Sequence, residues 1–250
     1  MTCVAILNLT VRRAGRPIVA DVTLALPERG LIGILGPNGA GKSTLARHLA
    51  GQPGAREGSI QVDGVEVAEM TAAHRAAMIG YIPQAFSPHW EISARMLVEM
   101  GASRRPDLPA GVVKDALAAA GLDAHADRPW STLSGGEKAR ALLAAVAVAD
   151  PQVLVADEPG ASLDIRHRIQ LMRRLADRSQ TRLVVVVMHD IELATTWCDR
   201  LVVMDAGRIV ADGASADIAR SGVLASVFGV PFETVEAGSV TVARPLPGRD

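Results

Sequence analysis

This chain of 250 residues has two cysteines, a net charge close to zero and no long apolar run. The two cysteines, Cys3 and Cys198, exclude a disulfide framework and suit a reducing compartment. A net charge of −1 leaves no basic surface for nucleic acid, so we expect no nucleic-acid partner. The longest apolar runs, 141–149 and 183–188, fall far short of the roughly 18 residues that a membrane span needs. The first residues do not resemble a secretion signal, so we expect a protein that reaches a membrane only through a partner.

Lysine is also rare, with only Lys42, Lys114 and Lys138 among 26 basic residues. Although arginine is the usual cation of this chain, Lys42 occupies the fixed position of a stretch that fits the phosphate-loop pattern G-x-x-x-x-G-K-[ST]. A lysine ammonium is small enough for a narrow loop, whereas the arginine fork is wide and planar. The loop consists of Gly36, Pro37, Asn38, Gly39, Ala40, Gly41, Lys42, Ser43 and Thr44.

The segments around this loop place it where its chemistry requires. Residues 31–35 are apolar and predict a buried strand, and 44–50 predicts a helix that ends at Gly51. Between a strand and a helix, glycines let backbone N–H groups surround phosphate oxygens, and the helix N-terminus favours negative charge. Lys42 can reach terminal phosphates, and the Ser43 hydroxyl can bind Mg²⁺. The alternative is a glycine-rich turn that fits the pattern by chance.

The alternation of predicted strands and helices indicates an α/β fold of one domain with a mostly parallel core sheet. Strands expected at 4–11 and 19–26 form an N-terminal antiparallel subdomain. From residue 85 to about residue 149, prolines alternate with short helical patterns, which predicts a helical lobe inserted into the sheet domain. On this division, 1–84 and 150–250 form the phosphate-binding core and 85–149 forms the lobe.

Two carboxylates follow another apolar strand, expected at 153–156. Ligands of open α/β sheets bind at the carboxyl ends of the strands, so Asp157 can hold Mg²⁺ opposite Ser43. Glu158 comes next and can orient or deprotonate an attacking water. An acidic loop after a core strand is the alternative interpretation, and the phosphate loop upstream makes it less favoured.

Two further polar residues are expected at the same edge. His189 ends the apolar run 183–188 and can donate a hydrogen bond to a terminal phosphate, although a lone histidine is more often structural. Gln84, after Pro83, can bind Mg²⁺ or water through its carbonyl oxygen. Its position at the start of the lobe would join the phosphate site to that lobe.

The segment Leu133–Glu137 opens a long predicted helix. Ser134, Gly135 and Gly136 leave free N–H groups at the helix start and so form a second candidate anion site. The alternative is an ordinary capping box, in which Ser134 is the N-cap and Glu137 the third helical residue.

Taken together, these features resemble the ATP-binding subunit of ABC transporters over nearly the whole chain. The signature segment is specific, because other phosphate-loop families lack it between the phosphate loop and the Walker B strand. The order of the motifs is the phosphate loop, the glutamine loop at Gln84, the signature 133–137, the Walker B strand 153–158, the D-loop Ser162, Leu163 and Asp164, and the switch His189.

The resemblance implies a P-loop ATPase that binds ATP with Mg²⁺ and acts as a head-to-tail homodimer. Ser134 and Gly136 of one subunit would close over ATP held by the phosphate loop of the other, giving two equivalent sites. The partners implied are integral membrane permease subunits and, indirectly, a substrate-binding protein. The implied location is peripheral, on the cytoplasmic face of the inner membrane.

A narrower resemblance and several departures refine this expectation. The segments 81–84, 89–93, 156–159 and 227–230 look like those of ATPases that drive iron–siderophore, haem and cobalamin import. Arg13 stands where the family often has an aromatic that stacks on adenine, and a guanidinium plane can also stack on a base. Gly160 stands where threonine is usual, and Lys138-Ala139 replaces the common Gln-Gln or Gln-Lys.

Two other functions compete with that of a transport ATPase. A soluble ABC-type ATPase for assembly or mechanical remodelling is the main alternative, whereas a small nucleotide kinase would lack the signature.

The segment 84–100 is apolar for an exposed loop, so we expect it to grip a permease helix, with about half of its apolar side chains inside the lobe. These side chains are Phe86, Trp90, Ile92, Met96 and Leu97.

Overall fold

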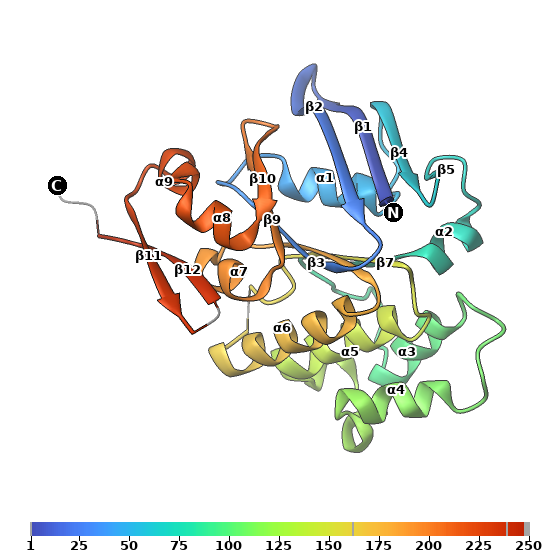
Figure 1. Cartoon of the computed structure of the whole chain (residues 1–250). Coiled ribbons are helices and arrows are strands. Elements are labelled where there is room, and N and C mark those ends of the chain that lie inside the picture. Colours follow the sequence, from blue (N-terminus) through green and yellow to red (C-terminus); the bar gives the residue numbers. More distant parts are fainter. Residues whose placement is uncertain (1, 162, 239, 248–250) are drawn as a thin grey trace.

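The computed structural model describes residues 2–161, 163–238 and 240–247, which form a layered α/β structure (Figure 1). Its central sheet has six strands in the order β10-β9-β3-β8-β7-β6. All neighbours are parallel except β10, which pairs antiparallel with β9. The strands are β3 (Gly30–Leu35), β6 (Ile79–Ile82), β7 (Val153–Asp157), β8 (Leu183–Val187), β9 (Arg200–Asp205) and β10 (Arg208–Ala214).

The strands of the central sheet are apolar on both faces because both faces are covered. In β3, Ile32 and Ile34 pack into the core beneath the N-terminal sheet, whereas Leu31 and Leu35 pack into a second core on the opposite face. Successive side chains of a strand point to opposite faces, so one apolar run supplies both cores.

A second, antiparallel sheet has the order β2-β1-β4-β5 and lies with α1 above the central sheet in Figure 1. It consists of β1 (Thr2–Arg13), β2 (Arg16–Pro27), β4 (Arg56–Val62) and β5 (Val65–Glu66). The first two strands extend beyond their predicted ends. Ala14 and Gly15 join them with φ of 49° and 77°, the left-handed pair that a tight two-residue hairpin turn requires. The predicted N-terminal antiparallel subdomain and the parallel core sheet are confirmed.

The helix predicted after the phosphate loop differs from the prediction at its start. Helix α1 (Lys42–Leu49) begins at Lys42 rather than Thr44, so the end of the phosphate loop is already helical. Helix α2 (Ala72–Met78) is capped by Thr71, whose hydroxyl accepts a hydrogen bond of 3.1 Å from the backbone N–H of His74.

Residues 85–149 contain helices α3 to α5, which lie with α6 below the central sheet in Figure 1. Trp130, Leu117 and Val98 belong to an apolar cluster separate from the two cores that flank the central sheet. The helices are α3 (Ala94–Ala102), α4 (Val112–Ala120) and α5 (Gly135–Ala147), with the short 3₁₀ turns η1 (Asp123–His125) and η2 (Trp130–Thr132).

The rest of the chain adds helices α6 to α9, which pack into one shared core, and a C-terminal hairpin that the sequence left unassigned. In that hairpin Ala243 is buried, and its backbone N–H donates to the Thr195 hydroxyl at 3.2 Å, which docks the hairpin on α7. Within the described ranges, no helix combines the length and apolar character needed to cross a bilayer. These elements are α6 (Ile165–Ser179), α7 (Ile191–Trp197), α8 (Ser215–Arg220), α9 (Val223–Phe228), β11 (Phe232–Ala237) and β12 (Val240–Pro245).

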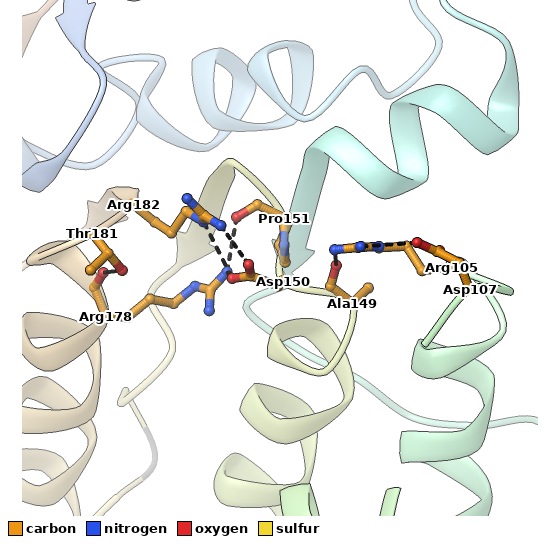
Figure 2. A network of polar contacts seen from close by, with 8 residues as sticks. All are labelled: Arg105, Asp107, Ala149, Asp150, Pro151, Arg178, Thr181 and Arg182. Carbon is orange, nitrogen blue, oxygen red and sulfur yellow. Dashed lines mark hydrogen bonds and ion pairs between the residues drawn. The ribbon is translucent and has the colours of Figure 1, made fainter. Parts of the chain in front are cut away.

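Polar contacts converge on residues 149–151, the link between α5 and β7, from the segment after α3 and from α6 (Figure 2). Arg178 and Arg182, from α6 and the loop after it, both bind the Asp150 carboxylate, and Arg178 also donates to the carbonyl of Pro151 at 2.8 Å. Arg105 donates to the carbonyl of Ala149 at 3.3 Å from the segment after α3. The network therefore connects three segments that are far apart in sequence.

Asp150 holds the centre of this network with a left-handed backbone, φ 47°. Asp150→Asn should lower the free energy of unfolding by about 0.5–1 kcal/mol, because the carboxylate is half exposed and such ion pairs are screened by solvent. Asp150→Ala should cost about 1 kcal/mol more, since alanine tolerates positive φ poorly. Urea unfolding of both variants measures this, and equal losses would contradict the backbone argument.

The effect of Asp150→Asn should also depend on pH. Burial alone would raise the pKa of Asp150, but hydrogen bonds and positive charge from Arg182 and Arg178 outweigh it and hold the pKa below its ordinary value of 3.8. The stabilisation is therefore complete above that value and is lost as the pH falls through the lower pKa of the folded state. Unfolding curves of parent and variant should converge at low pH.

Candidate functional site

The carboxyl ends of β3, β6, β7 and β8 meet at one edge of the central sheet, because these strands are mutually parallel. The phosphate loop follows β3, Gln84 follows β6, Glu158 follows β7 and His189 follows β8. One pocket brings Gln84, Glu158, His189 and most of the phosphate loop together with Ile18 of β2, which the sequence did not suggest. It is lined by Ile18, Asn38, Gly39, Ala40, Gly41, Lys42, Ser43, Thr44, Gln84, Glu158 and His189.

Glycine is required in the loop for close backbone approach. A side chain at Gly36 would collide with the carbonyl oxygen of Met204, and one at Gly41 would lie 2.5 Å from that of Ile18. Both residues also have positive φ, 150° and 98°. The loop therefore presses against β9 and β2 on one side and leaves its other side to the pocket.

Lys42 is only 5% exposed, and its ammonium donates to the carbonyls of Gly36 at 2.7 Å and Pro37 at 3.0 Å. Burial lowers the pKa of Lys42, while the carboxylates of Glu158 and Asp157 act in the opposite direction. The ammonium thus binds two carbonyl groups of its own loop, and the negative charges of Glu158 and Asp157 favour its protonated form.

Asp157 is 2% exposed and is held from two sides. Its Oδ1 accepts a hydrogen bond of 2.8 Å from the Ser43 hydroxyl, and its Oδ2 accepts one of 3.3 Å from the Tyr81 hydroxyl. Burial and the charge of Asp157 raise the pKa of Tyr81 to about 12, so this phenol remains a donor. Sequence reasoning missed Tyr81 as a site residue, although it is the single tyrosine of the chain and lies three positions before Gln84.

The Glu158 carboxylate is held between two residues that follow neighbouring strands, Gln84 after β6 and His189 after β8. Gln84 Nε2 donates to its Oε2 at 2.8 Å, and His189 Nε2 lies within hydrogen-bonding distance of its Oε1. The backbone of Glu158 is left-handed, with φ 50°, a conformation that costs free energy for a residue of this kind. The structure therefore aims this carboxylate at the pocket despite a local cost.

The remaining predicted residues lie elsewhere on the chain. Among the described residues, Ser134, Gly135, Gly136 and Asp164 do not line this pocket. Ser134 is the N-cap of α5 and makes both hydrogen bonds of a capping box with Glu137, at 3.3 and 2.7 Å. The capping interpretation of this segment is thus correct, and it leaves other roles open.

In the D-loop, Asp164 caps α6 by accepting from the backbone N–H of His167 at 2.9 Å. Leu163 packs into the core on the lower face of the sheet. Ser162 lies outside the described residues. The described D-loop residues thus fix the start of α6.

Arg13 lines a neighbouring pocket that shares Ile18 and Thr44 with the first. The other lining residues come from β1, α1 and the segment before β4: Val11, Arg12, Arg47, His48, Gly54 and Ala55. The side chain of Arg13 is exposed at the end of β1. A molecule with phosphates in the loop could place its other end in this second pocket.

The family model for the ABC transporter matches residues 19–161, more than half of the chain. The chain belongs to the ABC transporter family. Membership of this family means that it binds ATP and couples ATP hydrolysis to transport. The family resemblance predicted from the order of the motifs is therefore confirmed.

Two relatives extend the match beyond the family model. The hemin import ATP-binding protein HmuV of Rhodococcus jostii is 36% identical over 249 residues, which is 97% of this chain and 85% of that protein. The cobalamin import ATP-binding protein BtuD of Halobacterium salinarum is 37% identical over 254 residues, which is 97% of this chain but only 63% of that protein. The narrower resemblance to haem and cobalamin import ATPases is confirmed as well.

A solved structure shares the fold of this ABC family member. It is described as a metal-chelate type ABC transporter in an inward-facing conformation, and it superposes with a TM-score of 0.82 over 99% of this chain and 98% of the other, at 24% identity. This likeness confirms the predicted α/β fold with its mixed sheets and helices.

The second pocket gives a test of Arg13. If its guanidinium covers adenine, Arg13→Ala should weaken ATP binding by about 0.5–2 kcal/mol, the range for cation–π contacts, and Arg13→Tyr should be tolerated. The matched control is Arg16→Ala, because Arg16 pairs with Arg13 across the hairpin and is also exposed. Titration with a fluorescent ATP analogue measures both, and equal affinities in the two alanine variants would remove Arg13 from the site.

Proposed function

We propose that this chain is the ATP-hydrolysing subunit of an importer for a metal chelate, such as haem, cobalamin or an iron–siderophore. It works as a head-to-tail homodimer bound to a separate membrane permease, on the cytoplasmic face of the inner membrane. A binding protein delivers the solute to the permease. The hemin and cobalamin import relatives support import over the alternative of a soluble remodelling ATPase.

The observation that carries the ATPase chemistry is the clamp on Glu158 beside the buried ammonium of Lys42. Lys42 and the N–H groups of the loop bind the terminal phosphates of ATP. Glu158 accepts the proton of a water whose oxygen forms the new bond to the γ-phosphorus, while the bond to the ADP oxygen breaks. Gln84 and His189 keep the two carboxylate oxygens of Glu158 in place, and His189 can also donate to the γ-phosphate.

The donor set next to this clamp fits Mg²⁺. The Ser43 hydroxyl and the buried Asp157 carboxylate already lie 2.8 Å apart, and both offer the hard oxygen ligands that Mg²⁺ prefers. Gln84 can add its carbonyl oxygen. Bound with ATP, the ion neutralises charge that develops on the phosphates. In the protein, Tyr81 supports this arrangement by holding the second oxygen of Asp157.

The position of the second anion site supports the proposed dimer. Ser134, Gly135 and Gly136 start α5, and Asp164 starts α6, in places that do not line the pocket of their own chain among the described residues. In a second copy turned head to tail, they can cover the ATP on the phosphate loop. A twofold arrangement of this kind gives two equivalent sites.

The proposed permease-binding surface is a groove lined by residues 86–91, Trp130, Ser131 and Lys138. Within it, Trp90 is 64% exposed. Phe86 packs edge to face on Trp130, with ring centroids 5.3 Å apart, and Lys138 Nζ lies 5.8 Å from the Trp130 ring. Of the other apolar residues in this segment, Ile92 and Leu97 are buried and Met96 is exposed. An exposed tryptophan on a packed aromatic base is a suitable anchor for a partner helix.

We also propose that residues 85–149 move as a unit against the core formed by 1–84 and 150–250. The separate apolar cluster formed by α3, α4 and one face of α5 supports this division. The other face of α5 packs Leu143 and Val146 into the core below the sheet, so a rotation would make α5 slide against that core. Gln84 stands at the junction and bonds Glu158, so it can report the state of the ATP to the groove.

Replacing Glu158 tests the chemistry. Glu158→Gln should keep ATP binding but lower hydrolysis by roughly 10²–10⁴-fold, the usual contribution of a positioned general base. ATP-bound dimers should accumulate because hydrolysis reopens them. Glu69→Gln, a change on the exposed surface, is the control. Steady-state turnover with size-exclusion chromatography measures both effects, and hydrolysis by Glu158→Gln at the parent rate would rule Glu158 out as the base.

Replacing Trp90 tests the permease surface. Trp90→Ala should weaken permease binding by about 2 kcal/mol, as expected of an aromatic anchor, and reduce uptake while sparing ATP hydrolysis by the isolated subunit. Val210→Ala is the control, since Val210 is 47% exposed on β10 and lies outside both the groove and the segment 84–100. Pull-down and uptake equal to the parent would contradict the assignment. A lower melting temperature together with lost hydrolysis would show that Trp90 supports the fold instead.

A further inference from the structure

His167, in the first turn of α6, connects two segments that the proposed function places at the same ATP. On one side, its ring Nδ1 lies 2.9 Å from each carboxylate oxygen of Asp164. On the other side, the ring packs against Gly136 at the start of α5. Sequence reasoning gave His167 no role.

The contact with Gly136 leaves no room for a side chain. A Cβ built on Gly136 would lie 2.5 Å from His167 Cδ2 and 2.8 Å from Cγ. Gly136 is inside helix α5, where the backbone accepts any residue type, so its conformation does not require glycine. The histidine ring is therefore a reason for glycine at this position in addition to any contact with phosphate.

Asp164 fixes the ring in this orientation. The backbone N–H and then the ring of His167 lower the pKa of Asp164, which keeps the carboxylate ionised and accepting. With Nδ1–H directed at Asp164, the opposite edge of the ring faces Gly136. To yield to a larger residue at 136, the ring would have to break its hydrogen bonds to Asp164.

An ordinary helix cap does not account for this arrangement. The cap of α6 is complete once Asp164 accepts from the backbone N–H of His167, which needs no imidazole. The same position of α2 illustrates the difference: His74 is also the third residue of a helix and donates its backbone N–H to the N-cap, Thr71. The ring contact of His167 thus adds something beyond capping.

We propose that His167 is a positioning residue for the ATP contact made between subunits, which rests on the proposed function. Its ring locks the backbone at Gly136 to the Asp164 carboxylate. The Ser134–Gly136 anion site and the start of α6 then approach the ATP of the other subunit as one rigid surface. Removing the ring uncouples these two segments without touching the phosphate loop.

The test uses the full chain in four forms: His167→Ala, Gly136→Ala, the double variant and His74→Ala as control. His167→Ala should leave ATP affinity of the isolated subunit unchanged and lower hydrolysis roughly tenfold or more, as expected for loss of a hydrogen bond to a charged group. In a Glu158→Gln background, it should weaken ATP-driven dimerisation by a similar factor. His74→Ala should match the parent in each assay.

The double variant separates the ring contact from a direct phosphate contact. If the ring is what excludes a side chain at 136, Gly136→Ala should be the most impaired single variant, and adding His167→Ala should restore activity to that of His167→Ala alone. If the double variant stays as impaired as Gly136→Ala, the ring contact is not the constraint and the proposal is overturned. His167→Asn, which keeps a short donor for Asp164, should recover part of the activity and serves if His167→Ala unfolds.

The controls distinguish this inference from the proposed function. A parent chain that binds but does not hydrolyse ATP, or a Glu158→Gln chain that does not dimerise, would contradict the proposed function itself. If the parent does both and His167→Ala behaves like His74→Ala, only the positioning role fails. Melting temperatures of all variants show whether a loss of activity reflects unfolding.

Discussion

The shape of the phosphate loop and the position of two carboxylates depend on the burial of one ammonium group, that of Lys42. A cation that is so little exposed needs compensation, and it finds it in two carbonyls of its own loop and in the carboxylates of Asp157 and Glu158. To bring those carbonyls within reach, the loop must curl tightly, which demands glycine where it presses on β9 and β2. The carboxylates must in turn arrive at the end of a strand two places away in the sheet.

The sequence predicted those parts of the site whose residues are close together in the chain, and the α/β fold that brings them to one edge. The phosphate loop, the carboxylates after β7 and the cap at Ser134 depend on spacings of a few residues, which a sequence displays directly. Tyr81, Ile18 and the C-terminal hairpin were missed because their partners are distant in sequence and only tertiary packing brings them near.

Aromatic residues are so few in this chain that their positions are informative. The chain has three tryptophans, three phenylalanines and one tyrosine. Four of these seven occupy two places: Tyr81 bonds Asp157 beside the phosphate loop, and Phe86, Trp90 and Trp130 line the groove that we propose binds the permease. Large aromatic groups contribute strongly to buried contacts, so a protein with few of them builds its cores mainly from valine, leucine and isoleucine.

The left-handed backbone of Glu158 has a consequence for how this enzyme can drift or be engineered. Other non-glycine residues with positive φ include Asn8, Asp21, Asp63 and Asp150, which are side chains that tolerate this region, whereas glutamate gains no such relief. Glycine at 158 would release strain on the order of 1 kcal/mol and remove the carboxylate that we propose as the base. On that proposal, selection for thermal stability alone would favour an inactive chain, so stabilised variants need to be screened for turnover at every round.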